Sequence, residues 1–248
     1  MRQKVKAGYA RGNETEARIL NVAINLFGNR GFDSVSTREI ADAAAVPPAS
    51  LRYYFKSKQG LYVACLVHIQ ALSQPFVEPA LLAAEKILQD SASDADRLID
   101  AFCTIQEAQI DYSIGRPDAG ATALFMFRHD LPSDAGESNF TGGDGTFALR
   151  MISCFIQMMK AISGNTFDSQ RALIVAGLIN SQITIIHLKR KRLAEMGWDV
   201  TPEHLLWLKQ TIRFHTTAIL RAYSVKHLAA ASSSASVPVS SPTSAQIA

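Results

Sequence analysis

Apolar residues recur at helical spacing along most of the chain, and no segment alternates strictly between apolar and polar residues as a half-buried strand does. In the N-terminal quarter this pattern predicts a helix over 14–30 and three more that begin at Thr37, at Pro48 and near Gln59. Thr37 and Ser57 are the predicted N-caps, because their hydroxyls can accept hydrogen bonds from first-turn amides. Proline suits the first helical position because its fixed φ is already helical.

Further along, the same spacing predicts seven helical segments, at about 61–73, 76–89, 94–114, 119–130, 146–163, 168–195 and 202–227. Residues 131–145 are rich in Gly, Ser and Asp and are predicted to form a loop. Residues 229–248 are small and polar, so they cannot bury enough apolar surface to fold and are predicted to be disordered. The expected fold class is all-α.

The segments 37–44 and 48–55 have the lengths and the separation of a helix-turn-helix, whose second helix enters the DNA major groove. The apolar residues that would hold the two helices together are Ile40, Ala41, Ala44, Val46, Leu51 and Phe55. The residues left facing outward are Pro48, Ala49, Ser50, Arg52 and Tyr53. From this pattern alone, a core-forming helical hairpin with an ordinary solvated face is an equal alternative.

The unit lies within a longer ordered series of residues: Ile19-Leu20, Ala23, Phe27, Gly31-Phe32, Thr37-Arg38-Glu39-Ile40-Ala41, Ala44-Ala45-Val46, Leu51, Tyr54-Phe55, Lys58 and Leu61. This series resembles the N-terminal domain of the TetR family of transcriptional regulators over residues 13–62, a quarter of the chain. The resemblance implies an all-α homodimer with an N-terminal three-helix helix-turn-helix DNA-binding domain and a larger C-terminal helical domain. That second domain would bind ligand and form the dimer.

The domain organisation expected on this basis has four parts: a basic flexible arm over 1–12, the DNA-binding domain over 13–62, a helical regulatory and dimerisation domain over 63–228, and the tail over 229–248. The implied partners are a palindromic double-stranded DNA operator and a small-molecule effector, which most often releases a repressor from DNA. No membrane partner and no cofactor are implied.

Positions that align with DNA contacts of the family can be assigned residue by residue. Thr37 would cap its helix and bond a phosphate, and Arg38 would bond a phosphate beside it. The remaining predicted contacts are Pro48, Ala49, Ser50, Arg52 and Tyr53 on the recognition helix, and Tyr54 and Lys58 toward phosphates.

Three departures from the family pattern bear on these assignments. Ala45 stands where the family usually has Gly, which predicts strain in the turn. Pro47 stands where a capping Ser is frequent, and proline cannot cap through its side chain. Arg52 stands where Tyr is usual, and a guanidinium can fork onto guanine O6 and N7 or clamp a phosphate. The base preference is therefore the property that these changes alter.

Charge supports contact with DNA at the N-terminus. Residues 1–60 carry ten Lys/Arg against five Asp/Glu, whereas the rest of the chain carries fifteen against seventeen. The basic N-terminus lacks the apolar stretch of a secretory signal, and no transmembrane run appears, so a cytoplasmic location is expected.

Catalysis and redox sensing are the alternative functions. The sequence holds no GxSxG, HExxH, P-loop or dinucleotide fingerprint, so an enzyme is a remote alternative. Cys65, Cys103 and Cys154 are dispersed, which suits reduced core thiols better than a disulfide or a metal site. A redox-responsive regulator acting through one of them remains the second alternative.

Two functional surfaces are expected in the C-terminal part. Residues of three helices are candidates for an apolar ligand pocket, although for each one alone ordinary core is the favoured alternative: Phe125, Met126, His129, Met151, Cys154, Phe155, Met158, Ile183 and His187. The last two long helices resemble the pair that forms the family's four-helix dimer interface. Its expected close-packing residues are Ala176, Gly177, Ile179, Ile183, Leu205, Leu208, Ile212 and Ile219.

Overall fold

The computed structural model describes residues 2–90, 94–116, 119–129 and 146–224, and every regular element within these ranges is an α-helix. The all-α fold is therefore confirmed. The helices are α1 (Arg2–Arg30), α2 (Thr37–Ala43), α3 (Pro48–Phe55), α4 (Lys58–Gln89), α5 (Ala95–Ser113), α6 (Ala119–His129), α7 (Thr146–Ile162), α8 (Ser169–Leu188), α9 (Arg190–Glu195) and α10 (Pro202–Tyr223). The predicted loop over 131–145 and the predicted tail over 229–248 lie outside the described residues.

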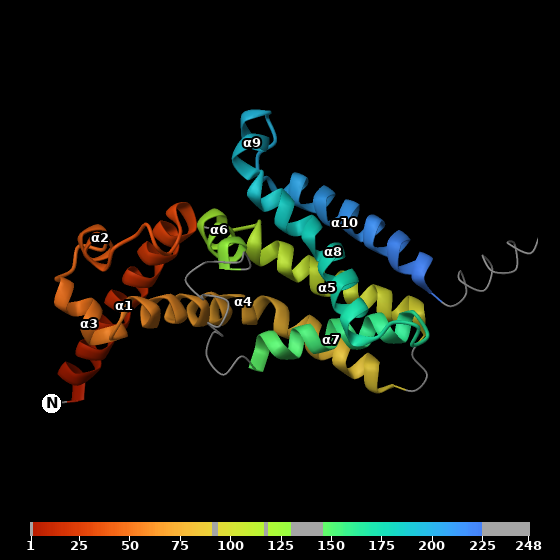
Figure 1. Ribbon diagram of the computed structural model, residues 1–248, viewed down its shortest axis with the longest axis horizontal. Coiled ribbons are helices and arrows are strands. Elements are labelled where there is room, and N and C mark those ends of the chain that lie inside the picture. The colour runs from red at the N-terminus through yellow and green to blue at the C-terminus, as the bar shows by residue number, and fades with distance from the viewer. Residues whose placement is uncertain (1, 91–93, 117–118, 130–145, 225–248) are drawn as a thin grey trace, which may run out of the picture.

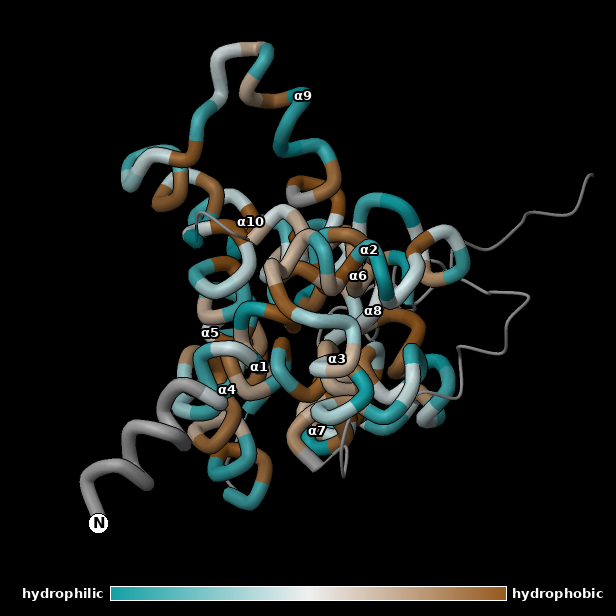
Figure 2. The backbone as a smooth tube through the Cα atoms, turned by 90° about the vertical axis from the view of Figure 1, so that its left-hand side faces the viewer, coloured by the Kyte–Doolittle hydropathy of each residue, from teal (hydrophilic) through white to brown (hydrophobic). Residues whose placement is uncertain are grey.

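The molecule is elongated and has a separate hydrophobic core at each end (Figure 1). At one end α1, α2 and α3 gather around the first part of α4, and we call this part the head. At the other end α5, α7, α8 and α10 pack around the second part of α4, and we call this part the body. Along the helices apolar residues alternate with polar ones, as helices with one buried face require (Figure 2).

Helix α4 joins the head to the body as one element, although the sequence predicted two helices with a break between them. Pro75 and Pro79 lie inside it, and a proline within a helix costs about 3 kcal/mol. The helix stays continuous because Leu61 is buried in the head core and Leu81 in the body core, so tertiary contacts stabilise both halves. By length and composition α4 could also cross a membrane, but its buried positions belong to two protein cores.

Two other helix boundaries differ from prediction. Helix α1 begins at Arg2, whereas the sequence predicted a basic flexible arm over 1–12 ahead of the helix. Gly8 and Gly12 each lower helix stability by only about 1 kcal/mol relative to alanine. Residues 14–30 already form a helix, so extending it toward the N-terminus adds one hydrogen bond per residue without a new nucleation step. The helix expected over 168–195 divides into α8 and α9 at Lys189, beyond which Arg190 donates to the backbone oxygen of Arg116 (3.2 Å).

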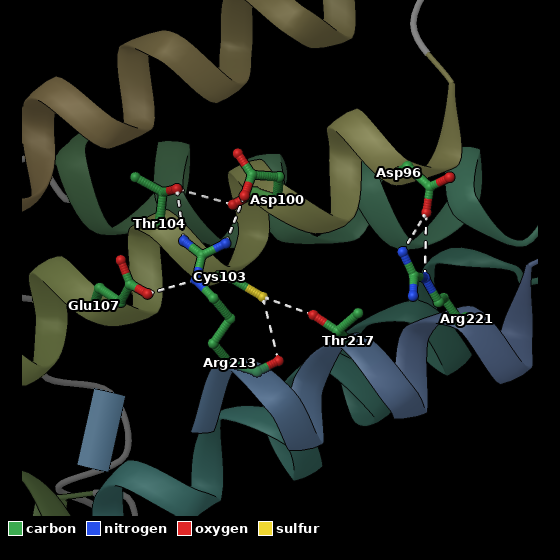
Figure 3. A network of polar contacts seen from close by, with 8 residues as sticks. All are labelled: Asp96, Asp100, Cys103, Thr104, Glu107, Arg213, Thr217 and Arg221. Atoms are coloured by element: carbon green, nitrogen blue, oxygen red, sulfur yellow. Dashed lines mark hydrogen bonds and ion pairs between the residues drawn. The ribbon is translucent and has the colours of Figure 1, made fainter. Parts of the chain in front are cut away.

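A polar seam fixes α10 against α5 (Figure 3). The guanidinium of Arg213 pairs with Asp100 and with Glu107 (2.6 Å), and Arg221 pairs with Asp96 (3.2 Å). Deeper between the helices, the hydroxyl of Thr216 donates to the side-chain oxygen of Gln106 (2.8 Å), whose amide donates to Asn180 of α8 (3.0 Å). These hydrogen bonds join α5, α8 and α10 into one unit.

The outer faces of α8 and α10 are apolar and exposed. Leu178 is 66% exposed on α8, and Phe214 is 72% exposed on α10. The rest of this surface, which we call the outer face, consists of Leu173, Ile174, Ile185, Leu206 and Trp207.

Five of the eight residues expected to form a dimer interface are buried within the chain and do not lie on this outer face. Gly177 and Ile219 are exposed, and Leu205 is half-buried. The others are buried within the chain itself: Ala176, Ile179, Ile183, Leu208 and Ile212. Ala176 and Ile179 belong to the body core, and the other three pack with Ile110 and Ile114 in a smaller apolar cluster. Spacing correctly predicted that these helices have apolar faces, but it did not distinguish the face buried within the chain from the exposed one.

Candidate nucleic-acid interface

Helix α2 begins with a capping box rather than at the predicted cap. The hydroxyl of Ser36 accepts from the backbone N–H of Glu39 (3.2 Å), and the carboxylate of Glu39 accepts from the backbone N–H of Ser36 (2.7 Å). Thr37 is therefore the first helical residue and not the N-cap. Hydrogen bonds from Ser36, and then from Arg30 at the end of α1, lower the pKa of Glu39 from 4.5 to about 2.

The turn between α2 and α3 has the backbone strain that the sequence predicted. Ala45 adopts φ 51°, in the left-handed region that favours glycine. The chain then reverses, and the N–H of Val46 donates to the backbone oxygen of Ala41 (3.0 Å). Pro48 is the first residue of α3 as expected, and Pro47 before it makes no side-chain cap within the described structure.

The two helices are held together by the apolar residues that the pattern selected. Ile40 and Ala41 of α2 are fully buried, and Leu51 and Phe55 of α3 are nearly so. Ala44 is also buried, and Val46 is half-buried against the same core. This packing fixes the angle between α2 and α3 and so decides which residues of α3 face solvent.

The outward face of α3 carries most of the predicted DNA contacts. Pro48, Ala49, Arg52 and Tyr53 are exposed, and Tyr53 is exposed to 82%. Ser50 is half-buried. Because α3 is a short helix whose buried side is anchored in the head core, this face can enter a groove without unfolding.

The predicted phosphate contacts border the same surface. Thr37 and Arg38 are exposed at the start of α2. Tyr54 is half-buried, with its ring 5.2 Å from that of Tyr53. Lys58 is half-buried, and its ammonium lies 4.3 Å from the centre of the Phe32 ring, a cation–π contact that orients the charge.

An open groove of about 920 Å³ is lined by five of the nine predicted contacts, namely Thr37, Pro48, Ala49, Arg52 and Lys58. The other four are not among its described lining residues: Arg38, Ser50, Tyr53 and Tyr54. Thr37 comes from α2, Arg52 from α3, and Lys58 from the start of α4. The groove also includes Lys56, which the sequence analysis omitted. Lys56 is exposed and has φ 63° at the end of α3. Its position two residues before Lys58, a predicted phosphate contact, could have marked it as a further contact.

These features define a helix-turn-helix DNA-binding protein: two short helices packed on a core, an exposed face on the second helix, and cations beside that face. Residues 19–65 match the sequence profile of the bacterial regulatory proteins of the tetR family. The head is therefore a DNA-binding domain of the TetR type, the domain found in this family of transcriptional regulators.

Similarity to known regulators extends beyond the head to most of the chain. The HTH-type transcriptional dual regulator CecR of Shigella flexneri is 24% identical over 231 residues, which cover 88% of this chain and 96% of CecR. The probable HTH-type regulator YttP of Bacillus subtilis is 47% identical over 47 residues, 19% of this chain and 23% of YttP. The structure of FadR from Bacillus subtilis aligns with a TM-score of 0.52 at 13% identity, covering 84% of this chain and 97% of FadR.

The body contains a second candidate site, a cavity of about 170 Å³ between α4, α5, α6 and α8. Of the residues predicted to line a pocket, Met126 and Ile183 line this cavity. Cys154, Phe155 and Met158 are instead buried in the body core, where Met151 packs beside them. The side chain of His187 is outside the described residues.

Helix α6 has one face toward the cavity and another toward the head. Phe125 and His129 are four residues apart and so share a face, which explains why neither lines the cavity. Phe125 is buried in the head core, and His129 lies 3.4 Å from the hydroxyl of Tyr62 on α4. Arg128 donates to the backbone oxygens of Gly28 (2.7 Å) and Asn29 (3.2 Å) at the end of α1.

The three cysteines are buried and have raised pKa values. Burial raises the pKa of Cys154 to about 12 and raises the pKa of Cys65 and Cys103 above the ordinary value as well. At neutral pH such thiols are protonated, and the thiolate is the reactive form. The environment of these residues therefore argues against the redox alternative.

Proposed function

We propose that this regulator is a ligand-responsive repressor that binds a palindromic operator as a homodimer and is released by a small molecule in the body cavity. Helix α6 carries this proposal, because it lines the cavity and also holds the end of α1. A ligand that changes the position of α6 therefore acts on the head through direct contacts. The protein acts by binding rather than catalysis, and its DNA target implies a cytoplasmic location.

The exposed outer face supports a homodimer. Exposed apolar side chains concentrated on two neighbouring helices are typical of protein–protein interfaces, and a second copy placed by a two-fold axis would bury this face against its own counterpart. A dimer carries two heads, so its operator has two related half-sites about one turn of DNA or more apart.

Substitution on the outer face tests the dimer. Phe214→Glu places a charge at a position that the isolated chain leaves 72% exposed, so the fold should survive while the dimer dissociates. Leu149→Glu is the matched control, because Leu149 is 62% exposed on α7, away from the outer face. Analytical ultracentrifugation should show a monomer for Phe214→Glu alone, with operator binding lost. A dimer that resists this change would contradict the proposed interface.

Contacts with phosphates should supply much of the affinity without selecting sequence. Lys58→Ala is expected to weaken binding to all sequences alike and to lower the log–log salt dependence by about one per head. Lys86→Ala, an exposed lysine on the body part of α4, is the control and should leave both unchanged. Loss confined to the cognate site would show instead that Lys58 reads bases.

Response to a ligand requires that the ligand prefer one arrangement of the heads over the other. FadR from Bacillus subtilis has been solved in complex with stearoyl-CoA, so a regulator of this fold can hold a small molecule. An effector of this protein should weaken operator binding, and saturating operator should weaken effector binding by the same factor. The coupling is tested by titrating effector with and without saturating operator, and operator with and without saturating effector. An effector whose affinity is the same with and without operator would refute the coupling.

A further inference from the structure

The composition of the body cavity indicates which kind of ligand it accepts. We propose that it binds a compact carboxylate with an apolar body of about one ring, held by Arg116 and Ser113. This inference rests on the ligand response proposed above and adds the chemical class of the ligand.

Size sets the first limit. The cavity holds about 170 Å³, and a dry protein cavity of about 150 Å³ is enough to bind benzene. A single ring with one small substituent therefore fits, whereas a long acyl chain does not fit without rearrangement. Ile69, Met126, Phe127 and Ile183 provide the apolar part of the wall.

Charge sets the second limit. Arg116 is the single ionisable cation in the described lining. Its guanidinium carbon lies 5.0 Å from the centre of the Tyr112 ring, and the hydroxyl of Tyr112 donates to the backbone oxygen of Ile69 (3.2 Å). The cation is thus held over an anchored ring at the cavity wall. A guanidinium in a fixed position binds a carboxylate by charge-assisted hydrogen bonds.

Ser113 supplies the complementary hydroxyl. Its Oγ is buried and has no hydrogen-bond partner within the described structure, and the residue lines the cavity. A buried hydroxyl without a partner is unfavourable, so a ligand that accepts its proton gains affinity. Ser113 at the end of α5 and Arg116 just beyond it line the same cavity, so one carboxylate can contact both.

Calorimetry on the full chain without DNA tests the proposal, with benzoate as the probe and benzamide as its neutral counterpart of the same shape. Benzoate should bind at least tenfold more tightly than benzamide. Arg116→Gln should remove that preference, whereas Arg171→Gln, an exposed arginine on α8, should keep it. Ser113→Ala should weaken benzoate binding several-fold, and Ser153→Ala on the exposed side of α7 should not.

A second variant covers the case in which Arg116→Gln fails to fold. Ala123→Leu fills the cavity from α6 and should abolish benzoate binding while the protein melts cooperatively. Equal binding of benzoate and benzamide, or no benzoate binding at millimolar concentration, would overturn the inference. If benzoate binds as proposed and leaves operator affinity unchanged, the carboxylate site stands and the proposed ligand response fails. If a neutral molecule releases the operator and benzoate does not bind, the ligand response stands and the carboxylate site is refuted.

Discussion

Helix α1 lies close to α6 at Gly28, and adding one methyl group there tests how tightly the head is joined to the body. A Cβ at this position would lie 2.7 Å from the backbone oxygen of Ala121 and 3.0 Å from the backbone nitrogen of Phe125. Both are main-chain atoms that cannot rotate away, so Gly28→Ala must push the two helices apart.

The expected magnitude combines opposing effects. Alanine in a helix interior is about 1 kcal/mol more favourable than glycine, whereas overpacking costs about 1–3 kcal/mol. Separation also lengthens the 2.7 Å hydrogen bond from Arg128 and exposes Phe125, each a loss of about 1 kcal/mol or more. We therefore expect Gly28→Ala to lower the free energy of unfolding by about 2–4 kcal/mol.

Urea unfolding followed by circular dichroism at fixed protein concentration measures this change. Gly120→Ala is the control, because a Cβ there meets nothing within 4 Å in the described part of the chain, and stability should not fall. Operator affinity should change only in Gly28→Ala, since only that variant moves α1 relative to the body. Equal stability of the two variants would refute the close approach and with it the proposed coupling through α6.

Four further outcomes are expected. Ala45→Gly should stabilise the protein by about 0.5–1 kcal/mol by relieving the left-handed backbone, whereas Ala43→Gly within α2 should destabilise it by about 1 kcal/mol. Arg52→Ala should weaken operator binding by about 1–3 kcal/mol and relax the selected base at one pair per half-site; a uniform loss across sequences would place Arg52 on a phosphate. Because the folded state lowers the pKa of Glu39, its contribution is present above about pH 4.5 and lost as pH falls through 2, so Glu39→Gln should flatten the stability curve in that range. Cys154 should resist a thiol reagent at pH 8 in the native protein and react with it in urea.

Local features of the head could be predicted because the residues responsible are neighbours in the chain. Pro48 begins α3 and Ser57 caps α4 as expected, since both effects act within one turn. The left-handed turn at Ala45 was also predictable, because the family pattern marks it with glycine. The wrong cap of α2 is a near miss of the same kind: Ser36 and Thr37 are adjacent hydroxyl residues, and only Ser36 has Glu39 at the capping-box spacing.

Features that depend on which helices meet were not predictable in the same way. Helical spacing shows that a face is apolar, but it does not say what covers that face. On α8, Ala176 and Leu178 are two positions apart in one apolar sequence, yet Ala176 is buried in the body core and Leu178 is 66% exposed. On α6, Phe125 entered the head core while its neighbour Met126 lines the cavity. The sequence by itself determined the helices, the recognition face and the basic end of the chain, because those follow from local periodicity, capping and charge. The tertiary structure decided the cavity, the outer face and the continuity of α4, because each depends on contacts between residues far apart in the chain.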